Sequence, residues 1–428
     1  MMKKINWIAF LTIFLLVGCS KSGNGDKPKD ENGNETPDHE LIGQVLPDWE
    51  EGYLDIHAIN TGRGESTLLI FPDGTTMLID AASSLISPNH EVPPVAQKPN
   101  INVAPGLTIT NYARHFIKSA SNKLNYMLLT HFDHDHIGGI DDTLPMDPTG
   151  TFRMGGFAEV GAKLPVDKII DRAYPTYDFP RNLTGAPRIA NYISFLEWTK
   201  SARGTEVEQF VVGRNDQIVL TENPSKYPNF KVQNIVGNGV VWTGIETGTR
   251  NTFPSAGELV AASASENIFS LGFEVSYGKF DYFTAGDLQY NGRSTHPWKD
   301  IEAPVAAVVS EVDVMKGNHH ATLHCNGTAI LSSLKPETMV IHTWRDVQPN
   351  PETISRMFNT NPTMQVFTTN LTSPNRTRLG ADYNKLKATQ GHIVVRVSPG
   401  GEEYYVYVLD DNNQDYKVTD VFGPYKSK

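Results

Sequence analysis

The order of apolar and polar positions predicts that strands dominate the chain. Residues 54–59 (Leu-Asp-Ile-His-Ala-Ile) alternate apolar and polar side chains, as a half-buried strand does. Apolar runs at 66–71 and 76–79 flank Pro72-Asp73-Gly74, whose composition is typical of a hairpin turn. We therefore expect the folded region to begin with antiparallel strands.

The same pattern continues toward the C-terminus, with a few helices between the strands. Turns at Tyr277-Gly278 and Pro399-Gly400-Gly401 predict two more hairpins. The further predicted strands are 124–129, 217–220, 230–235, 270–275, 280–284, 305–314, 392–397 and 404–409, and the predicted helices are 110–120 and 189–200. This mixture of elements predicts the α+β class.

The N-terminus has the pattern of an export signal. Lys3 and Lys4 precede an almost unbroken apolar stretch, residues 5–17, which ends in Gly18-Cys19. A membrane-spanning helix needs about 20 apolar residues, so this shorter stretch is typical of a signal peptide. A small residue directly before a cysteine resembles a lipoprotein signal, in which the cysteine is acylated and becomes the new N-terminus. We expect removal of residues 1–18 and lipidation of Cys19; an ordinary signal peptide or an uncleaved anchor is the alternative.

Residues 19–46 contain mostly Lys, Asp, Glu, Asn, Gly and Pro, and such a segment cannot bury enough surface to fold. We expect it to tether a folded domain, residues 47–428, to the membrane of a bacterial cell envelope, facing the periplasm or the surface. The formal charge is −11, and removal of Lys3 and Lys4 would make the chain more acidic. Since an acidic surface repels phosphate backbones, strong nucleic-acid binding is not expected.

A dense group of metal-ligand side chains follows the predicted strand 124–129. The motif is His131-Phe-Asp133-His134-Asp135-His136, which places five candidate ligands within six residues. Sites in α/β sheets usually form at the carboxyl ends of strands. Imidazole and carboxylate groups bind Zn or Mn, and crowding them beside a buried strand is unfavourable unless something binds them. The sequence therefore predicts one or two divalent metal ions here rather than a polar surface loop.

The segment Thr130-His-Phe-Asp-His-Asp-His-Ile-Gly-Gly139 resembles the His-x-His-x-Asp-His-x-Gly-Gly signature of the metallo-β-lactamase superfamily, with Asp133 at the second ligand position. That variant is similar to the hydrolase domain of the ComEC-type DNA-uptake proteins. Further segments resemble that subfamily in the same order and together cover about residues 53–410: 54–66, 76–80, 267–270, 283–287 and 316–322. The resemblance implies an αββα sandwich, two mixed sheets packed between helices, with an insertion at about 141–265.

The resemblance also implies roles for individual residues. One metal would be held by His131 and Asp133, the second by Asp135, His136 and either His319 or His320, with His320 slightly favoured, and Asp287 would bridge the two. Asp80 would support the ligand loop by accepting hydrogen bonds. His134 would point away from the metals.

Several positions depart from the family pattern. Residues 137–286 contain no histidine, so the metal site of His131 and Asp133 would be rich in oxygen ligands. The alternatives are a preference for Mn over Zn, a single firmly bound metal beside a weak site, or a further ligand elsewhere in the chain. The Gly-Ser after the histidine pair is Ala321-Thr322, which loses backbone freedom. The late Gly-His-Pro is replaced by residues 348–351, and His342 is expected to be a core histidine.

The implied activity is hydrolysis by a metal-activated water, with Asp135 orienting the water and moving its proton. Asn267, Lys316 and Thr322 are candidates for substrate contact, although each also has an ordinary structural explanation. The expected substrate is a phosphodiester, either a small molecule or nucleotide-like. The alternatives are lactam or lactone hydrolysis, and a non-catalytic surface binding protein on a degenerate hydrolase fold.

Overall fold

The computed structural model describes residues 39–85, 95–290 and 295–428. The chain divides into two units, Met1–Thr36 and Pro37–Lys428, and the second unit is described below. The predicted signal peptide, Cys19 and most of the predicted tether lie outside the described residues. Within the described ranges, no helix has both the length and the hydropathy that a membrane span requires.

Two mixed sheets form the centre of the second unit. The first sheet, in spatial order over the described residues, contains β17 (Val418–Lys426), β16 (Glu403–Leu409), β15 (His392–Val397), β1 (Leu54–Ala58), β2 (Thr67–Ile70), β3 (Thr76–Ile79), β4 (Leu124–Leu128), β5 (Val166–Asp171) and β6 (Glu206–Gln209). Neighbours are antiparallel from β17 to β3 and parallel from β3 to β6.

The second sheet contains, in the same part of the chain, β14 (Gln365–Thr368), β13 (Thr338–Ile341), β12 (Val314–Lys316), β11 (Phe280–Ala285), β10 (Gly272–Tyr277), β7 (Phe230–Gly237), β8 (Val240–Trp242) and β9 (Thr249–Asn251). Here β14 to β11 are parallel and the remaining neighbours are antiparallel.

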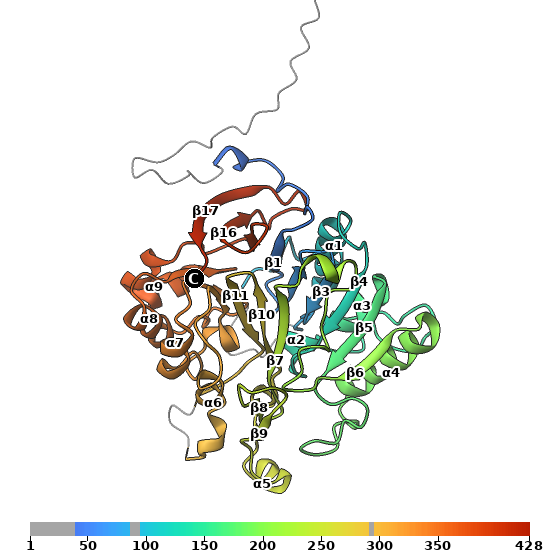
Figure 1. Cartoon of the computed structure of the whole chain (residues 1–428). Coiled ribbons are helices and arrows are strands. Elements are labelled where there is room, and N and C mark those ends of the chain that lie inside the picture. Colours follow the sequence, from blue (N-terminus) through green and yellow to red (C-terminus); the bar gives the residue numbers. More distant parts are fainter. Residues whose placement is uncertain (1–38, 86–94, 291–294) are drawn as a thin grey trace, which may run out of the picture. The chain divides into compact units, whose positions relative to one another are not determined.

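Helices cover the outer faces of both sheets. The first sheet carries α1 (Pro105–Ile117), α3 (Gly156–Lys163) and α4 (Pro187–Arg203), and the second carries α6 (Glu302–Ala306), α7 (Thr328–Leu334), α8 (Pro351–Thr360) and α9 (Ser373–Leu379). Figure 1 shows the two groups of helices on opposite sides of the strands. The shorter elements are α2 (His134–Ile137), α5 (Ala256–Ala261), η1 (His39–Leu41), η2 (Pro224–Lys226), η3 (Glu266–Phe269), η4 (Pro297–Lys299), η5 (Asn318–Ala321) and η6 (Gly380–Lys385).

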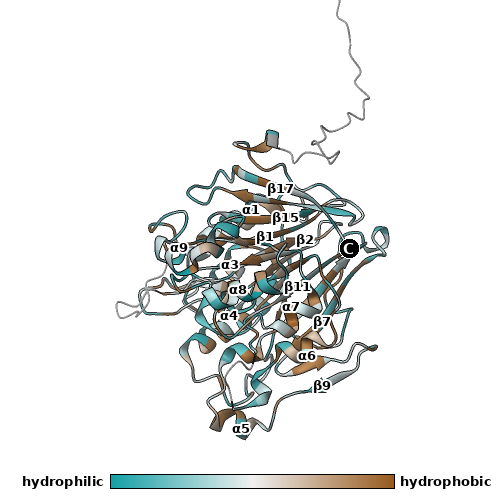
Figure 2. Cartoon of the chain, turned by 90° about the vertical axis from the view of Figure 1, so that its left-hand side faces the viewer, coloured by the Kyte–Doolittle hydropathy of each residue, from teal (hydrophilic) through white to brown (hydrophobic). Residues whose placement is uncertain are grey.

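Three apolar cores separate these layers. Because side chains alternate along a strand, β2 sends Leu68 and Ile70 to the core beneath α1, α3 and α4, and Leu69 to the core between the sheets. A third core lies between the second sheet and its helices. Figure 2 shows hydrophobic residues gathered on the strands in the middle of the view. The expected α+β sandwich of two mixed sheets with helices is therefore confirmed.

The predicted hairpins at 66–79, 270–284 and 392–409 are confirmed as β2–β3, β10–β11 and β15–β16. The helix predicted at 110–120 begins earlier, at Pro105, and the helix predicted at 189–200 extends to 187–203. The first strand, predicted to be half-buried, is buried on both faces because the polar side chains Asp55 and His57 are also covered.

Two predicted strands are wrong. The run 305–314 contains the last two residues of α6, then an irregular segment, and only the first residue of β12, Val314. Val309 and Val312 are buried although they lie outside any helix or strand. The run 217–220 is irregular. Its backbone bonds to side chains instead of a neighbouring strand: Val219 N–H donates to the hydroxyl of Tyr126 at 3.2 Å.

The segment 141–265, expected as an insertion, supplies β5 and β6 to the first sheet and β7, β8 and β9 to the second. It is therefore an integral part of the sandwich. The predicted tether, 19–46, overlaps the packed region: Gly43 N–H donates to Val418 O at 2.8 Å, and Leu46 is buried. Its last residues thus pack on β17.

Candidate metal centre

The candidate ligands gather where strands of both sheets end. Asp80 and His131 follow the parallel strands β3 and β4, while Asp287 and His320 follow β11 and β12, which are also parallel. Parallel strands bring their carboxyl ends to one edge of a sheet. A backbone hydrogen bond from Leu271 N–H to Thr130 O, at 3.0 Å, joins the two edges beside the site.

Asp80 holds the ligand loop in place. Its Oδ1 accepts from Thr130 N–H at 2.8 Å, and its Oδ2 accepts from Thr130 Oγ1 at 2.7 Å. The same Oδ2 accepts from His136 Nδ1 at 2.7 Å. Asp80 is fully buried and its φ is 55°, a region that few residues other than Gly adopt. Asp80 therefore accepts three hydrogen bonds from the ligand loop and lies beside the candidate ligands.

The surroundings fix the proton position of three histidines. His136 Nδ1 donates to Asp80, and His320 Nδ1 donates to His342 O at 3.1 Å. His131 Nδ1 lies 3.1 Å from Thr130 Oγ1, which already donates its proton to Asp80 and therefore accepts here. In the neutral form, each histidine thus keeps its lone pair on Nε2.

Those three Nε2 atoms converge on Asp287. His136 Nε2 lies 3.2 Å from Asp287 Oδ1, while His320 Nε2 and His131 Nε2 lie 3.7 and 4.0 Å from Oδ2. Asp135 Oδ2 lies 3.2 Å from His320 Nε2. Asp287 itself is oriented by Ser270, whose hydroxyl accepts from Asp287 N–H at 2.8 Å.

Four atoms of this group are buried without a hydrogen-bond partner among the described residues: the Nε2 atoms of His131, His136 and His320, and Asp287 Oδ1. Buried polar atoms are nearly always paired, and leaving them unpaired is costly. A cation between them would accept all of these lone pairs at once. The residues present therefore fit a divalent metal.

Glu65 belongs to the same group and was missed by the sequence analysis. One ligand atom from each of Glu65, His136, Asp287 and His320 lies within 4.8 Å of the others. Glu65 Oε2 also pairs with the buried Lys316 Nζ at 2.9 Å, and Glu65 N–H donates to Asp135 O at 2.9 Å. The sequence feature that could have identified Glu65 is an acidic residue in a Gly-rich turn between two buried strands.

The electrostatics favour a cation. Burial alone would raise the pKa of Asp287, but the surrounding histidines, His136 first, hold it well below its ordinary value. Burial would lower the pKa of His136, yet Asp287 and Asp80 raise it. Burial and then Asp135 raise the pKa of Asp133. Several carboxylates thus share a space in which positive charge, on the histidines or on a bound cation, relieves their repulsion.

His320 is better placed than its neighbour His319. His320 is fully buried and directs Nε2 toward Asp135 and Asp287. His319 is partly exposed, and its Nε2 lies 3.0 Å from Asn267 Nδ2 and 3.6 Å from Asp287 Oδ2. His319, His320 and Ala321 have φ values of 46°, 52° and 54°, so Ala321 occupies a left-handed position that favours glycine.

The side of the site formed by His131 and Asp133 is more open. Their closest ligand atoms, Nε2 and Oδ2, are 3.8 Å apart, and the Asp133 side chain is about one-third exposed, with a relative exposure of 35%. Arg188 of α4 places a guanidinium nitrogen 4.0 Å from Asp133 Oδ1. As the sequence predicts, no histidine from 137–286 contributes, since that range has none.

The remaining candidate residues have structural contacts. Lys316 bonds to Glu65 and Gly286 O and is buried. Thr322 is partly buried beside the buried Cys325. His134 Nδ1 contacts Ser84 Oγ at 3.0 Å rather than the ligand group. His342 is buried, with Nε2 3.1 Å from Ser66 O, as expected of a core histidine.

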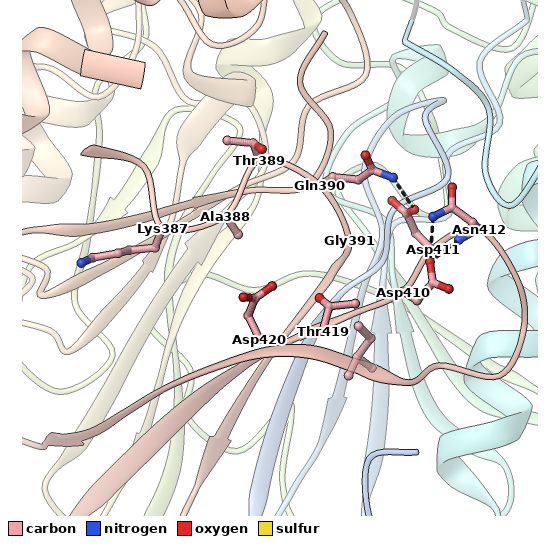
Figure 3. Close-up of a pocket in the computed structure, with 11 residues that line it drawn as sticks. Lys387, Ala388, Thr389, Gln390, Gly391, Asp410, Asp411, Asn412, Thr419 and Asp420 are labelled. Atoms are coloured by element: carbon pink, nitrogen blue, oxygen red, sulfur yellow. Dashed lines mark hydrogen bonds between the residues drawn. The ribbon is translucent and has the colours of Figure 1, made fainter. Parts of the chain in front are cut away.

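A separate polar cavity of about 320 Å³ lies where the segment before β15 meets the ends of β16 and β17 (Figure 3). Two of its three acidic side chains, Asp410 and Asp411, are already paired, and the third is Asp420. Asp411 binds Lys98 at 2.9 Å and accepts from Gln390 at 3.0 Å, while Asp410 accepts from the side chain of Asn412 at 2.7 Å. None of the proposed metal ligands lines it, so it is distinct from the metal centre.

No protein-family profile and no curated protein matches the chain. Among solved structures, one protein from Parabacteroides distasonis, whose own assignment as a metal-dependent hydrolase is a proposal, aligns with 74% of this chain and 92% of its own, at 11% identity and a TM-score of 0.33. A TM-score of that size does not define a shared fold. The candidate site therefore depends on its own geometry.

Proposed function

We propose that the chain is a metal-dependent hydrolase with a metallo-β-lactamase type of fold. The observation that carries the proposal is the convergence on Asp287 of three buried histidine Nε2 atoms. None of these atoms has a hydrogen-bond partner among the described residues, and each histidine has Nδ1 engaged as a donor. The ordered sequence motifs and the layered arrangement of two mixed sheets support it.

Two neighbouring positions suit metal ions. His136, Asp135 and His320 would hold one ion, His131 and Asp133 the other, and Asp287 lies between the two sets. A bound divalent ion such as Zn or Mn would lower the pKa of a coordinated water and polarise the scissile bond. Asp80 contributes by keeping His136 in the tautomer that a metal ligand needs.

Asp135 is the residue proposed to handle the attacking water. Trp344 Nε1 donates to Asp135 Oδ2 at 3.1 Å, and His320 Nε2 lies against the same oxygen. Oδ1 is therefore the oxygen left to orient the water and to hold its proton. The indole contact keeps the carboxylate in one orientation, which reduces the reorganisation needed during reaction.

An anionic substrate, such as a phosphodiester, fits this site better than a neutral lactone. Arg188 stands at the open side of the site, and an arginine there suits a phosphate oxygen. The acidic chain favours a small or nucleotide-like molecule over long nucleic acid. Lactam or lactone hydrolysis and a non-catalytic binding role are the alternatives to test.

The test combines metal analysis with three chromogenic substrates: a phosphodiester, a cephalosporin and a lactone. We expect one or two ions per chain and cleavage of the phosphodiester, with that activity lost in Asp135→Ala. Arg188→Ala should raise KM for the phosphodiester and leave any lactone KM unchanged. Absence of bound metal would overturn the proposal, and cleavage of the cephalosporin or lactone alone would overturn its phosphodiester part.

A further inference from the structure

A buried arginine outside the ligand set reaches the ligand loop. Arg172 directly follows β5 and comes first by volume among the fully buried side chains of the described residues. A guanidinium is always charged and is seldom buried without full pairing. The contacts of Arg172 therefore indicate its structural role.

Glu266, at the start of η3, pairs with one edge of this guanidinium through both of its carboxylate oxygens. Arg172 Nε donates to Glu266 Oε1 at 2.6 Å, and Nη2 donates to Oε2 at 2.8 Å. Nη1 donates to Phe179 O and Asn238 Oδ1, each at 3.2 Å. The guanidinium is thus paired along its whole edge, the geometry that makes an arginine–carboxylate pair strong and directional.

The same ion pair contacts the ligand loop at Phe132, which lies between the proposed ligands His131 and Asp133. Glu266 Oε1 accepts from Phe132 N–H at 3.1 Å. The guanidinium carbon lies 4.6 Å from the centre of the Phe132 ring and 5.0 Å from that of Phe269. The backbone and the ring of Phe132 therefore both contact one ion pair, formed by a fully buried arginine and a partly exposed glutamate.

Residues 266–270 also reach the other ligand segments. Asn267 Nδ2 lies 3.0 Å from His319 Nε2, and Ser270 Oγ accepts from Asp287 N–H at 2.8 Å. One short segment thus contacts the loop after β4, the loop after β11 and the loop after β12. Arg172 connects this segment to β5 of the opposite sheet.

We propose that Arg172 and Glu266 are positioning residues that hold His131 and Asp133 in place for a metal ion. The inference rests on the proposed metal-dependent function. It also gives a physical reason why a metal could bind here without a further histidine: the two ligands would be held by the Arg172–Glu266 pair instead of by a third ligand. Neither residue touches substrate, so their effect is on the ligand loop.

The test uses Arg172→Lys and Glu266→Gln in the full chain. Lysine keeps the charge but loses the planar fork and the stacking between rings; glutamine replaces one acceptor oxygen with a donor. In metal-free protein, we expect amide hydrogen exchange of residues 129–136 to be at least about tenfold faster in both variants than in wild type. By chelator competition, the weaker metal ion should bind at least about tenfold less tightly, whereas binding of the tighter one should be unchanged.

Arg396→Lys provides the matched control. Arg396 is also a buried arginine that pairs through one edge with both carboxylate oxygens of an acidic residue, Asp55, at 2.8 and 2.6 Å. It is not in contact with any proposed ligand among the described residues. This variant should lower the melting temperature without changing exchange of 129–136 or metal affinity. Unchanged exchange and unchanged metal affinity in the Arg172 and Glu266 variants would overturn the positioning role. If the wild type binds no metal and exchange is still faster in the variants, the proposed function is overturned. Arg172 and Glu266 would then only stabilise the loop 129–136.

Discussion

At the scale of single residues, the contact that most directly tests the chemistry is Trp344 with Asp135. Trp344→Phe keeps the ring but removes the N–H that Asp135 Oδ2 accepts. A hydrogen bond to a charged acceptor contributes about 1.5–3 kcal/mol, so we expect kcat for the phosphodiester to fall about tenfold or more. Steady-state kinetics and metal analysis on the same sample distinguish a lower kcat of the metal-loaded protein from a lower metal content.

Trp49→Phe is the control for that change. Trp49 is also buried, and its Nε1 donates to Tyr53 O at 2.7 Å, in a part of the molecule without proposed ligands. It should leave kcat unchanged. An equal loss in both variants, or a full kcat in Trp344→Phe, would show that the indole N–H does not position Asp135.

How much of the site the sequence predicts depends on where each residue's partners lie in the chain. His131, Asp133, Asp135 and His136 are adjacent, so their spacing alone indicates a metal. For Glu65 the local sequence offers only an acidic residue in a Gly-rich turn, and its partner Lys316 lies 251 positions away. The family pattern could not choose between His319 and His320; burial and the bond of His320 Nδ1 to His342 O favour His320.

At the scale of elements, local turn chemistry predicts hairpins well, and alternation is a weaker guide. The turn residues at Pro72-Asp73-Gly74 close β2–β3 as expected. The runs 217–220 and 305–314 show the limit, since an apolar run fits a buried strand and a buried helix equally. In the run 217–220, the backbone N–H of Val219 donates to the side chain of Tyr126, 93 positions earlier in the chain. No local sequence pattern indicates so distant a hydrogen-bond partner.

The pairing of β1 with β15 gives a prediction about pH. Although burial alone would raise it, the pKa of Asp55 is lowered to about 2 from its ordinary value of 3.8, because Arg396 and His57 favour the charged form. A group with a lowered folded-state pKa stabilises the protein above its unfolded pKa and loses that effect as pH falls. We expect the pair to contribute about 2 kcal/mol above pH 4 that disappears as pH falls toward 2.

Urea unfolding between pH 5 and pH 2 measures that contribution. Other carboxylates also titrate there, so the comparison is with the double variant Asp55→Asn/Arg396→Met, which removes the pair without leaving a buried charge. Its stability should depend less on pH than that of wild type, by about the same 2 kcal/mol. Parallel pH profiles in the two proteins would contradict the assignment.

At the scale of the whole molecule, the proposed metal ligands come from both sheets, so a bound metal would join the sheets and its removal should affect global stability. The unpaired atoms of His131, His136, His320 and Asp287 come from loops of both sheets. A ligand present at about 100 times its Kd stabilises the folded state by about 2.7 kcal/mol. We expect EDTA to lower the melting temperature by several degrees and added Zn to restore it.

Asp287→Asn is the control for metal removal, because it leaves the shape of the side chain but weakens the ligand that the two sets share. Its melting temperature should respond little to EDTA or Zn. If wild type and Asp287→Asn melt alike in both conditions, the sheets are not joined through a metal.

Attachment of the domain to a membrane is predicted to depend on Cys19, which lies outside the residues that the structure describes. The compact unit begins at Pro37, and an acylated Cys19 would connect it to a membrane through a polar segment. A single lipid chain binds a membrane only marginally, so stable anchoring needs more than one chain, as the resemblance to a lipoprotein signal implies.

Expressed in bacteria, the wild type should partition into the detergent phase of Triton X-114 and incorporate labelled palmitate, and Cys19→Ser should do neither. Cys325→Ser, which alters the buried second cysteine, should behave as wild type. Recovery of the wild type in the aqueous phase without label would exclude the lipid anchor while leaving the metal centre untouched, since every proposed ligand lies at or beyond Glu65.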